Sequence, residues 1–495
     1  MRDHGAFYSP EVGAVIKERL PVEELFGLGG DGEFRFGRMT EPHRLAASVT
    51  PEVMDQLALT MLDSRSDDTA RDSPMPAGYT YFGQFIAHDL THDIAAQVQP
   101  ASGSIPDYGL GTPFFDLSGL YGTDGGALDS DTGKFHVPKI SHPDEYNGYP
   151  ESTSWVTLPR ASNNGVGLAK IPDRRNDDNV ILAHIHLLFM VFHNALMDSY
   201  GGTDLPAKIR EVRQVVEHHY QWLVLNDYLG PWIVGRKRLK KALKTSPRFY
   251  NVADHLGTQK LVPLECAGAF FRYGHSQIRR LYRWASDDAA AARLVIALSG
   301  AGDLARTDLR PRWVMDWGHF FECSKKVIPN YARKIDSYIS PDLSKLPHSG
   351  EGSLAARTLI RGLGSYELPD AQLFAEQLEF DKMMSSSEIL ASAGENEARQ
   401  RLYLEHKMHE KTPLWLYTLL EAEKGGGDKL GPLAGAVVAE VMVGLMRVTN
   451  NSVLEGIDET TFESSPFKDE IANGKFSLSQ LILWVNEKYP GALRL

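Results

Sequence analysis

The chain has 495 residues, of which 42% are hydrophobic, 10% aromatic and 23% charged; this composition is that of a globular protein and excludes a disordered or fibrous chain. Its 52 basic and 64 acidic residues give a net charge of -12, which argues against nucleic acid or an anionic membrane bound through bulk charge. The two cysteines, Cys266 and Cys323, form no CxxC pair, so a disulfide framework and a thiolate zinc site are excluded.

The sequence predicts one mainly α-helical body preceded by an arm. Residues 1–75 are polar, with charge-mixed turns, and are expected to pack as an arm on the rest. Gly, Pro, Asp and Ser clusters make residues 76–160 rich in loops. Residues 178–335 are expected to form long helices, with 3.6-residue periodicity in 181–200 and 209–229. Further helices are expected at 413–423 and 431–448.

Neither a signal peptide nor a membrane span is evident. The N-terminus carries scattered charges and no apolar core region, so a cytoplasmic or leaderless-secreted protein is expected. The most apolar stretch, residues 180–197, holds three histidines and an asparagine, which would be costly in lipid. A buried core helix is therefore predicted there.

A polar pattern interrupts the apolar segment from Tyr81 to Leu90. On a helix, Gln84 and His88 share one face, and Asp89 points about 100° away from His88. The histidine and the amide could thus line one cavity while the carboxylate serves another site. The alternative is a core histidine with satisfied hydrogen bonds beside a cap.

A second pattern follows in the loop-rich region. Thr112, Phe114, Asp116 and Ser118 stand at alternate positions, so in an extended or looped backbone their oxygens face the same way. Hydroxyl, carboxylate and carbonyl oxygens suit calcium, and Asp89 could complete the set. Turn formation is the simpler explanation for each residue alone.

Two further segments carry charge or histidine. Residues 173–179 (DRRNDDN) precede an apolar helix and could cap it, or could direct arginines into a cavity. Residues 270–278 (FFRYGHSQI) hold His275 beside Gly274, a setting that suits axial ligation of haem iron by a neutral imidazole.

The four segments together resemble the animal-type haem peroxidases of the peroxidase–cyclooxygenase superfamily, in order and in spacing. Residues 83–91 are similar to the family's distal helix, 112–122 to its calcium loop, 174–179 together with 186–194 to its distal-arginine helix and 270–278 to its proximal helix. The resemblance covers about residues 35–460 and is closer to bacterial members. It implies a mainly α fold with long loops and little β structure, with residues 76–495 as one catalytic domain.

The resemblance also implies roles for single residues. The distal residues are the base His88, the amide Gln84 and the arginine Arg175. On the proximal side it implies His275 as the iron ligand, Arg272 and Arg361 near the haem propionates, and Thr358 where an asparagine usually accepts a hydrogen bond from that histidine. The implied calcium ligands are Asp89, Thr112, Phe114 through its carbonyl, Asp116 and Ser118.

Three positions depart from the mammalian pattern of covalent haem attachment. Ala87 replaces one ester-forming aspartate, and Asn179 replaces the methionine that forms a sulfonium link in some members. Asp178 matches the second ester position with a shorter side chain. The implied cofactors are therefore haem b, with at most one ester link through Asp178, and calcium.

The implied activity is that of a haem peroxidase that takes hydrogen peroxide and oxidises small donors (phenols, halides or pseudohalides) through an oxyferryl intermediate. A haem-dependent fatty-acid dioxygenase is the nearest alternative, but Arg272 stands where that class has a tyrosine, and Tyr273 is one position late. A third possibility is a non-catalytic binding protein on the same scaffold. Zinc on His184, His186 and His193 is disfavoured, because residues two apart on a helix do not face each other.

Overall fold

The computed structural model describes fourteen segments of the chain. They are residues 36–43, 49–63, 69–91, 112–122, 127–140, 155–163, 166–258, 260–284, 292–294, 313–344, 353–364, 366–454, 462–463 and 465–495. Residues 1–35, 44–48 and 64–68 of the predicted arm lie outside this description, so the division between arm and catalytic domain stays a prediction.

Helices dominate the described residues. The α-helices are α2 (Pro51–Met61), α3 (Gly78–Leu90), α5 (Ser118–Tyr121), α6 (Val180–Ser199), α7 (Leu205–Trp222), α8 (Arg236–Lys244), α9 (Leu264–Gly268), α12 (Leu354–Leu363), α13 (Ala371–Gln377), α14 (Ser386–Ala391), α15 (Glu397–Glu405), α16 (Leu414–Lys424), α17 (Pro432–Val448), α18 (Lys468–Ala472) and α19 (Leu478–Lys488). A π-helix, η4 (Leu223–Ile233), continues α7. The 3-10 helices are η2 (Thr69–Arg71), η3 (Arg174–Asp177), η5 (Val252–Thr258), η6 (Phe270–His275), η8 (Trp317–His319) and η9 (Pro341–Ser344).

The strands are short and pair into small antiparallel ribbons. They are β1 (Asp72–Pro76) with β6 (Tyr331–Arg333), β2 (Arg160–Asn163) with β3 (Val166–Ala169), and β4 (Leu281–Arg283) with β5 (Ala292–Leu294). The predicted mainly α fold with little β structure is therefore confirmed. The predicted boundary at residue 75 falls inside β1, whose partner β6 comes from far along the chain.

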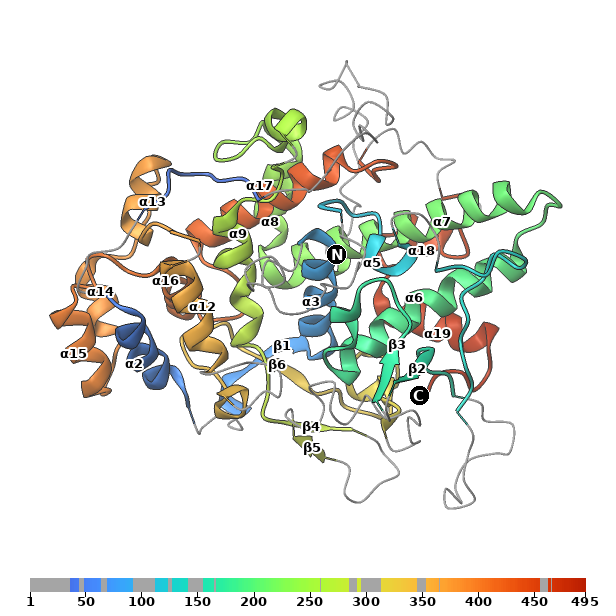
Figure 1. Cartoon of the computed structure of the whole chain (residues 1–495), viewed down its shortest axis with the longest axis horizontal. Coiled ribbons are helices and arrows are strands. Elements are labelled where there is room, and N and C mark those ends of the chain that lie inside the picture. The colour runs from blue at the N-terminus through green and yellow to red at the C-terminus, as the bar shows by residue number, and fades with distance from the viewer. Residues whose placement is uncertain are drawn as a thin grey trace.

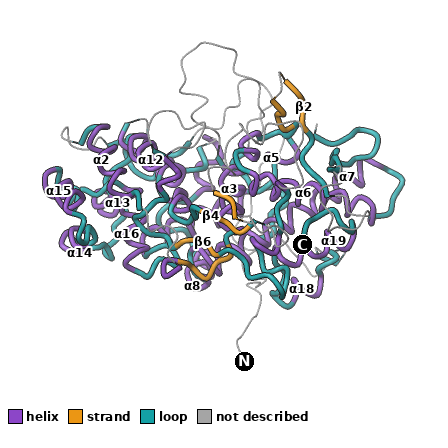
Figure 2. The backbone as a smooth tube through the Cα atoms, turned by 90° about the horizontal axis from the view of Figure 1, so that it is seen from below, coloured by secondary structure: helices purple, strands orange, loops and turns teal. Residues whose placement is uncertain are grey.

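Helix α3 lies in the middle of the protein (Figure 1). Helices α2 and α12 to α16 gather at one end, whereas α5, α6, α7, α18 and α19 gather at the other (Figure 2). One apolar cluster runs through the described chain from Val49 to Leu493. Side chains on α3 can therefore contact elements from both ends of the protein.

Helix α6 forms the centre of one end. Asn179 caps its N-terminus, because the side-chain oxygen accepts a hydrogen bond from Leu182 N at 2.9 Å. Among the described helices α6 alone has the length and hydropathy of a membrane span, and all of its apolar window is buried inside the protein. The predicted buried core helix is confirmed. The rings of Phe189 on α6 and Phe85 on α3 stack at 5.4 Å between centroids.

The periodicity of the sequence predicted the long helices but not the stretch after them. Helix α6 and the α7–η4 pair coincide with the predicted periodic segments, and α16 and α17 coincide with the helices expected at 413–423 and 431–448. The expectation of long helices throughout 178–335 is wrong, because after α8 the described residues form only short helices and strands. The proximal segment is likewise a 3-10 helix, η6, rather than a long α-helix. Pro247, Pro263 and several glycines interrupt this region, and proline removes a backbone donor that a helix needs.

Candidate functional site

His88 lies on the last turn of α3 with one ring nitrogen held by the protein. Its Nδ1 is 3.0 Å from Oδ1 of Asn176, a buried residue of η3. Burial first, and then the Arg175 charge, lower the pKa of His88 to about 4. His88 is thus neutral near pH 7, although its side chain keeps some accessible surface.

Arg175 is fixed to the end of α3 by its own neighbours. Its Nε donates to Asp173 Oδ1 at 3.0 Å, and its Nη2 donates to Asp173 Oδ2 at 2.6 Å. The same Nη2 donates to the backbone carbonyl of His88 at 2.8 Å. Although burial acts to raise the pKa of Asp173, the Arg175 charge holds it below its ordinary value. The guanidinium and the imidazole therefore keep a fixed relation to each other.

Gln84 and Asn179 orient each other's amide groups. The backbone donor Leu182 N requires that Asn179 present its oxygen to α6 and its Nδ2 to the opposite side. That Nδ2 donates to Gln84 Oε1 at 3.1 Å. The Nε2 donors of Gln84 consequently point away from Asn179. Asp178, the predicted ester position, is exposed.

His275 closes the 3-10 helix η6 and is bordered by α12 and α16. Thr358 on α12 places its hydroxyl 3.4 Å from His275 Nδ1, while that hydroxyl donates to Leu354 O at 2.8 Å. Since the hydroxyl proton is already used, its oxygen is the acceptor that faces the imidazole. Trp415 on α16 lies edge-on to the ring at 5.9 Å, and its Nε1 donates to Arg272 O at 3.1 Å.

Positive charge accumulates around His275. Burial first, and then the charges of Arg272, Arg357 and Arg361, lower the pKa of His275 to about 3. Arg357 and Arg361 are four residues apart on α12 and therefore share a face. Neither forms an ion pair within the described part of the chain, and the buried Nε of Arg357 has no hydrogen-bond partner there. The sequence interpretation missed Arg357, although its spacing from Arg361 was a usable signal.

The histidines come from elements that touch each other. Helices α3 and η6 are in contact, and Arg272, three residues before His275, is close enough to His88 to lower its pKa. A hydrogen bond of 2.8 Å between the hydroxyls of Tyr228 and Tyr273 also lies here. Tyr228 packs on Gly83 of α3, where an added Cβ would stand 2.0 Å from the tyrosine oxygen. Only glycine allows this close approach.

The predicted calcium loop folds so that its oxygens converge. Thr112 Oγ1 donates to Asp116 Oδ2 at 2.6 Å and lies 3.2 Å from Ser118 Oγ. Ser118 N donates to Asp116 Oδ1 at 2.9 Å. The backbone is not extended, because Leu117 has a left-handed φ of 55°. The segment gathers these oxygens through a turn instead of through strand-like alternation.

Asp89 faces this loop from α3. It is 3% exposed, and neither carboxylate oxygen has a hydrogen-bond partner in the described structure. Burial, and then the Asp116 carboxylate, raise the pKa of Asp89 well above its ordinary value. The Tyr220 hydroxyl and the Leu117 backbone lie beside it and act to lower that pKa, but neither meets the geometry of a full hydrogen bond to the carboxylate. Burying a carboxylate without a partner is costly, so this site has the character expected for a cation.

The three histidines of α6 do not form a zinc site. His184 Nε2 accepts from Met315 N at 3.2 Å, His186 Nδ1 contacts Asn176 at 3.1 Å, and His193 Nδ1 contacts Tyr121 at 3.1 Å. Across the described segments, no three His, Cys, Asp or Glu side chains gather closely enough to hold a metal.

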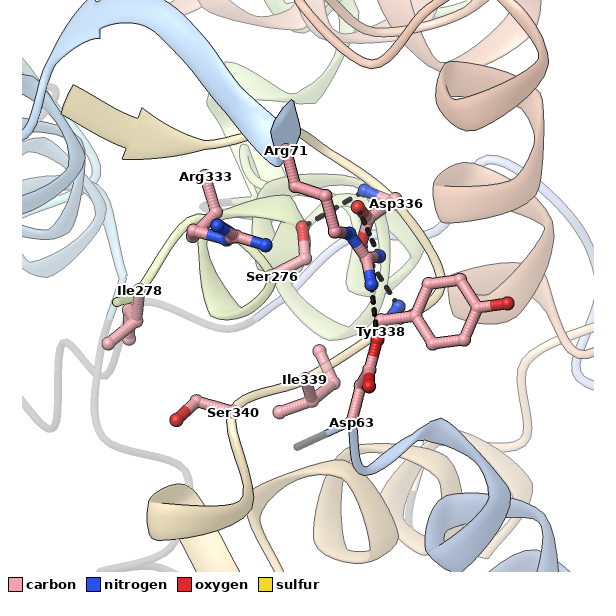
Figure 3. A pocket seen from close by; sticks show the side chains of 9 residues that line it. All are labelled: Asp63, Arg71, Ser276, Ile278, Arg333, Asp336, Tyr338, Ile339 and Ser340. Carbon is pink, nitrogen blue, oxygen red and sulfur yellow. Dashed lines mark hydrogen bonds and ion pairs between the residues drawn. The ribbon is translucent and has the colours of Figure 1, made fainter. Parts of the chain in front are cut away.

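A small polar pocket lies directly after the proximal histidine (Figure 3). Arg71 forms ion pairs with Asp63 and Asp336 there, the latter at 2.7 Å. Asp336 N also contacts the hydroxyl of Ser276 at 3.4 Å. Since its charges are paired, this cluster serves to tie the segment that follows His275 to β1 and β6.

Solved structures with the same fold are peroxidases and dioxygenases. Peroxidase A from Dictyostelium discoideum is 16% identical, with a TM-score of 0.60 over 93% of this chain and 95% of that one. The fatty acid alpha-dioxygenase of Oryza sativa is 16% identical, with a TM-score of 0.59 over 94% and 82%. That of Arabidopsis thaliana is 15% identical, with a TM-score of 0.57 over 94% and 78%. The fold is that of the peroxidase–cyclooxygenase superfamily.

The family follows from the sequence itself. The sequence model of the animal haem peroxidase family matches residues 110–447. No curated protein matches the chain. The chain belongs to the animal haem peroxidase family.

Proposed function

We propose that this protein is a haem peroxidase that uses hydrogen peroxide to oxidise small electron donors such as phenols, halides or pseudohalides. The observation that carries the proposal is the distal arrangement, in which a neutral His88 and a cationic Arg175 are held together at the end of α3. These are the proton acceptor and the fixed charge that cleavage of a peroxide bond requires.

The residues around His275 fit a haem. His88 and His275 each keep some accessible surface, although burial is the main cause that lowers their pKa values. This combination is expected for side chains that border an internal cofactor site. His275 would ligate the iron, while Arg357 and Arg361, which lack an anionic partner among the described residues, would hold the propionates together with Arg272. The haem would supply the redox chemistry. Exposed Asp178 is the position for an ester link.

The protein's own residues would move the proton. His88 would accept a proton from hydrogen peroxide at Nε2 and return it to the departing oxygen. Arg175 would stabilise the negative charge that develops as the peroxide bond polarises. The Nε2 donors of Gln84, oriented by Asn179, would bind the substrate oxygen or a halide beside them.

Measurements on the native protein test this function directly. An absorption spectrum should show a Soret band that changes when hydrogen peroxide is added. We expect oxidation of phenols, iodide and bromide to be faster than that of chloride, because Ala87 and Asn179 remove two of the three covalent links that strain the haem in mammalian relatives. A haem-loaded protein that oxidises none of these donors would instead indicate the non-catalytic binding protein.

We further propose that Asp89, Thr112, the Phe114 carbonyl, Asp116 and Ser118 bind calcium. The support is the convergent oxygen set and the unpaired, buried carboxylate of Asp89. Because Asp89 is adjacent to His88 on α3, the cation would restrain the helix turn that carries the distal base.

Asp116→Ala is expected to lose the calcium and to lower stability. A ligand present at about 100 times its Kd stabilises the folded state by about 2.7 kcal/mol, and this contribution would vanish. Metal analysis and thermal unfolding with and without a chelator measure both effects. Calcium affinity should rise with pH, because the raised pKa of Asp89 means that binding releases a proton. Exposed Asp131→Ala is the control, and native protein without calcium would contradict the assignment.

The pair of tyrosines favours a second candidate function, fatty-acid dioxygenation. Tyr273 is out of register in sequence, yet its hydroxyl reaches Tyr228, which packs on the helix of Gln84 and His88. A buried, hydrogen-bonded phenol in this place could carry a radical.

Tyr273→Phe separates the two functions. If the protein is a peroxidase, the variant should keep oxidation of phenols and iodide within about twofold, since the hydroxyl has no part in proton transfer. The matched control is Tyr282→Phe, which breaks a second buried pair of tyrosine hydroxyls, Tyr81–Tyr282 at 3.0 Å. Oxygen consumption with linoleate or palmitate that is abolished by Tyr273→Phe but not by Tyr282→Phe would establish the dioxygenase.

A further inference from the structure

His88 is one end of a buried chain of three side chains. Asn176 lies between two histidines: its Oδ1 is 3.0 Å from His88 Nδ1, and its Nδ2 is 3.1 Å from His186 Nδ1. Asn176 is 2% exposed and His186 is 0% exposed. Solvent therefore does not reach Asn176 or His186, and among the described residues the amide oxygen contacts His88 while the amide nitrogen contacts His186.

The chemistry of an amide decides where the histidine protons lie. An amide oxygen only accepts, so His88 Nδ1 must carry the proton in the bond to Asn176. An amide nitrogen only donates, so His186 Nδ1 must present its lone pair, and its proton resides on Nε2. The His186 Nε2 atom is buried and has no hydrogen-bond partner among the described residues.

This arrangement leaves the Nε2 of His88 unprotonated. If the amide were turned over, its nitrogen would donate to His88 Nδ1, and the proton of His88 would move to Nε2. The Nε2 atom could then no longer accept a proton. The orientation of one buried amide thus determines whether His88 has the form of a base.

We propose that Asn176, whose amide nitrogen contacts His186, is a positioning residue that holds His88 in the tautomer protonated at Nδ1. Asn176 and His186 touch no reacting atom and act only through His88. The proposal rests on the proposed function for its catalytic meaning, but the tautomer is a property of the protein that can be measured without turnover.

The test is the protonation pattern of His88, read by two-bond ¹⁵N–¹H correlation on the full-length, ¹⁵N-histidine-labelled protein. The sample is reduced and saturated with carbon monoxide so that any haem is diamagnetic. His88→Gln identifies the His88 signals. We expect native His88 to be protonated at Nδ1 and native His186 at Nε2.

Four variants show whether Asn176 sets this pattern. Asn176→Ala should move the His88 proton to Nε2 in a substantial fraction of molecules, whereas Asn176→Asp should retain Nδ1–H because a carboxylate still accepts. His186→Phe should give both tautomers, since the amide nitrogen loses its hydrogen-bond partner and the amide can turn over. Asn194→Ala is the control, because among the described residues the side chain of this buried asparagine of α6 bonds only to the backbone of Phe135, at 2.8 and 2.9 Å.

Asn176→Ala should also slow the reaction with peroxide by about 10–100-fold, the usual size for a residue that orients a functional imidazole. Native His88 protonated at Nε2, or an unchanged pattern in Asn176→Ala, would overturn the proposal. If Asn176→Ala does not fold, unchanged tautomers in His186→Phe would overturn it as well. A native protein that shows the expected tautomer but does not react with peroxide would refute the peroxidase and leave this inference intact.

Discussion

Replacing His275 with glycine or alanine is expected to strip the protein of haem and abolish its Soret band. His275 is the imidazole that would ligate the iron, and among the described residues around it Thr358 and Trp415 offer no second nitrogen ligand. Haem content by extraction and the absorption spectrum measure the effect.

Imidazole added to the His275→Gly variant distinguishes lost ligation from lost folding. The ring is surrounded by α12 and α16, so its removal leaves space for one free imidazole, which should restore the band. Thr358→Val is the companion variant, which should keep haem but shift its spectrum, because the oxygen that faces Nδ1 is removed. Unchanged haem content in the glycine variant would refute His275 as the ligand.

Replacing His88 with alanine should slow the reaction with hydrogen peroxide by about 10²–10⁴-fold, the range that a positioned acid–base group contributes. Haem content should stay near the native value, because His88 belongs to α3 and not to the segment that carries His275. Stopped-flow absorption after mixing with peroxide measures the rate.

Arg175→Ala should have an effect of the same direction, because the fixed charge beside His88 is lost. Its neighbour Arg174 is exposed and provides the matched control, since Arg174→Ala removes an equal charge from the same 3-10 helix. A peroxide reaction that is unchanged in His88→Ala would contradict the acid–base role. Equal losses in both arginine variants would assign the effect to the local charge in general.

Peroxidase and dioxygenase chemistry are both compatible with this fold, since solved structures of each class resemble the chain. The register of Tyr273 argued for a peroxidase from sequence alone. The structure adds that the phenol reaches Tyr228 beside α3 despite that register. The position of Tyr273 in the sequence thus favours a peroxidase, whereas its position in space is compatible with a dioxygenase. The Tyr273→Phe variant decides between the two.

Local sequence determined the secondary structure where its pattern was long and regular. Apolar residues recurring every 3.6 positions predicted α6 and α7, because a helix buries that face wherever it packs. The same periodicity put Gln84 and His88 on one face of α3. The region after α8 has no such repeat, and its short helices and strands depend on what packs around them.

Only the tertiary structure determined which polar groups meet. The contacts of Asn176 with His88, of Asn179 with Gln84 and of Thr358 with His275 join residues 83 to 95 positions apart. Hydrogen bonds are directional and short, so shifts of about 1 Å between packed helices decide whether they form. The residues of the distal and proximal sides could be identified from sequence motifs. The packing of α3 against η3, α6 and η6 decided their orientation, the tautomer of His88 and the unpaired state of Asp89.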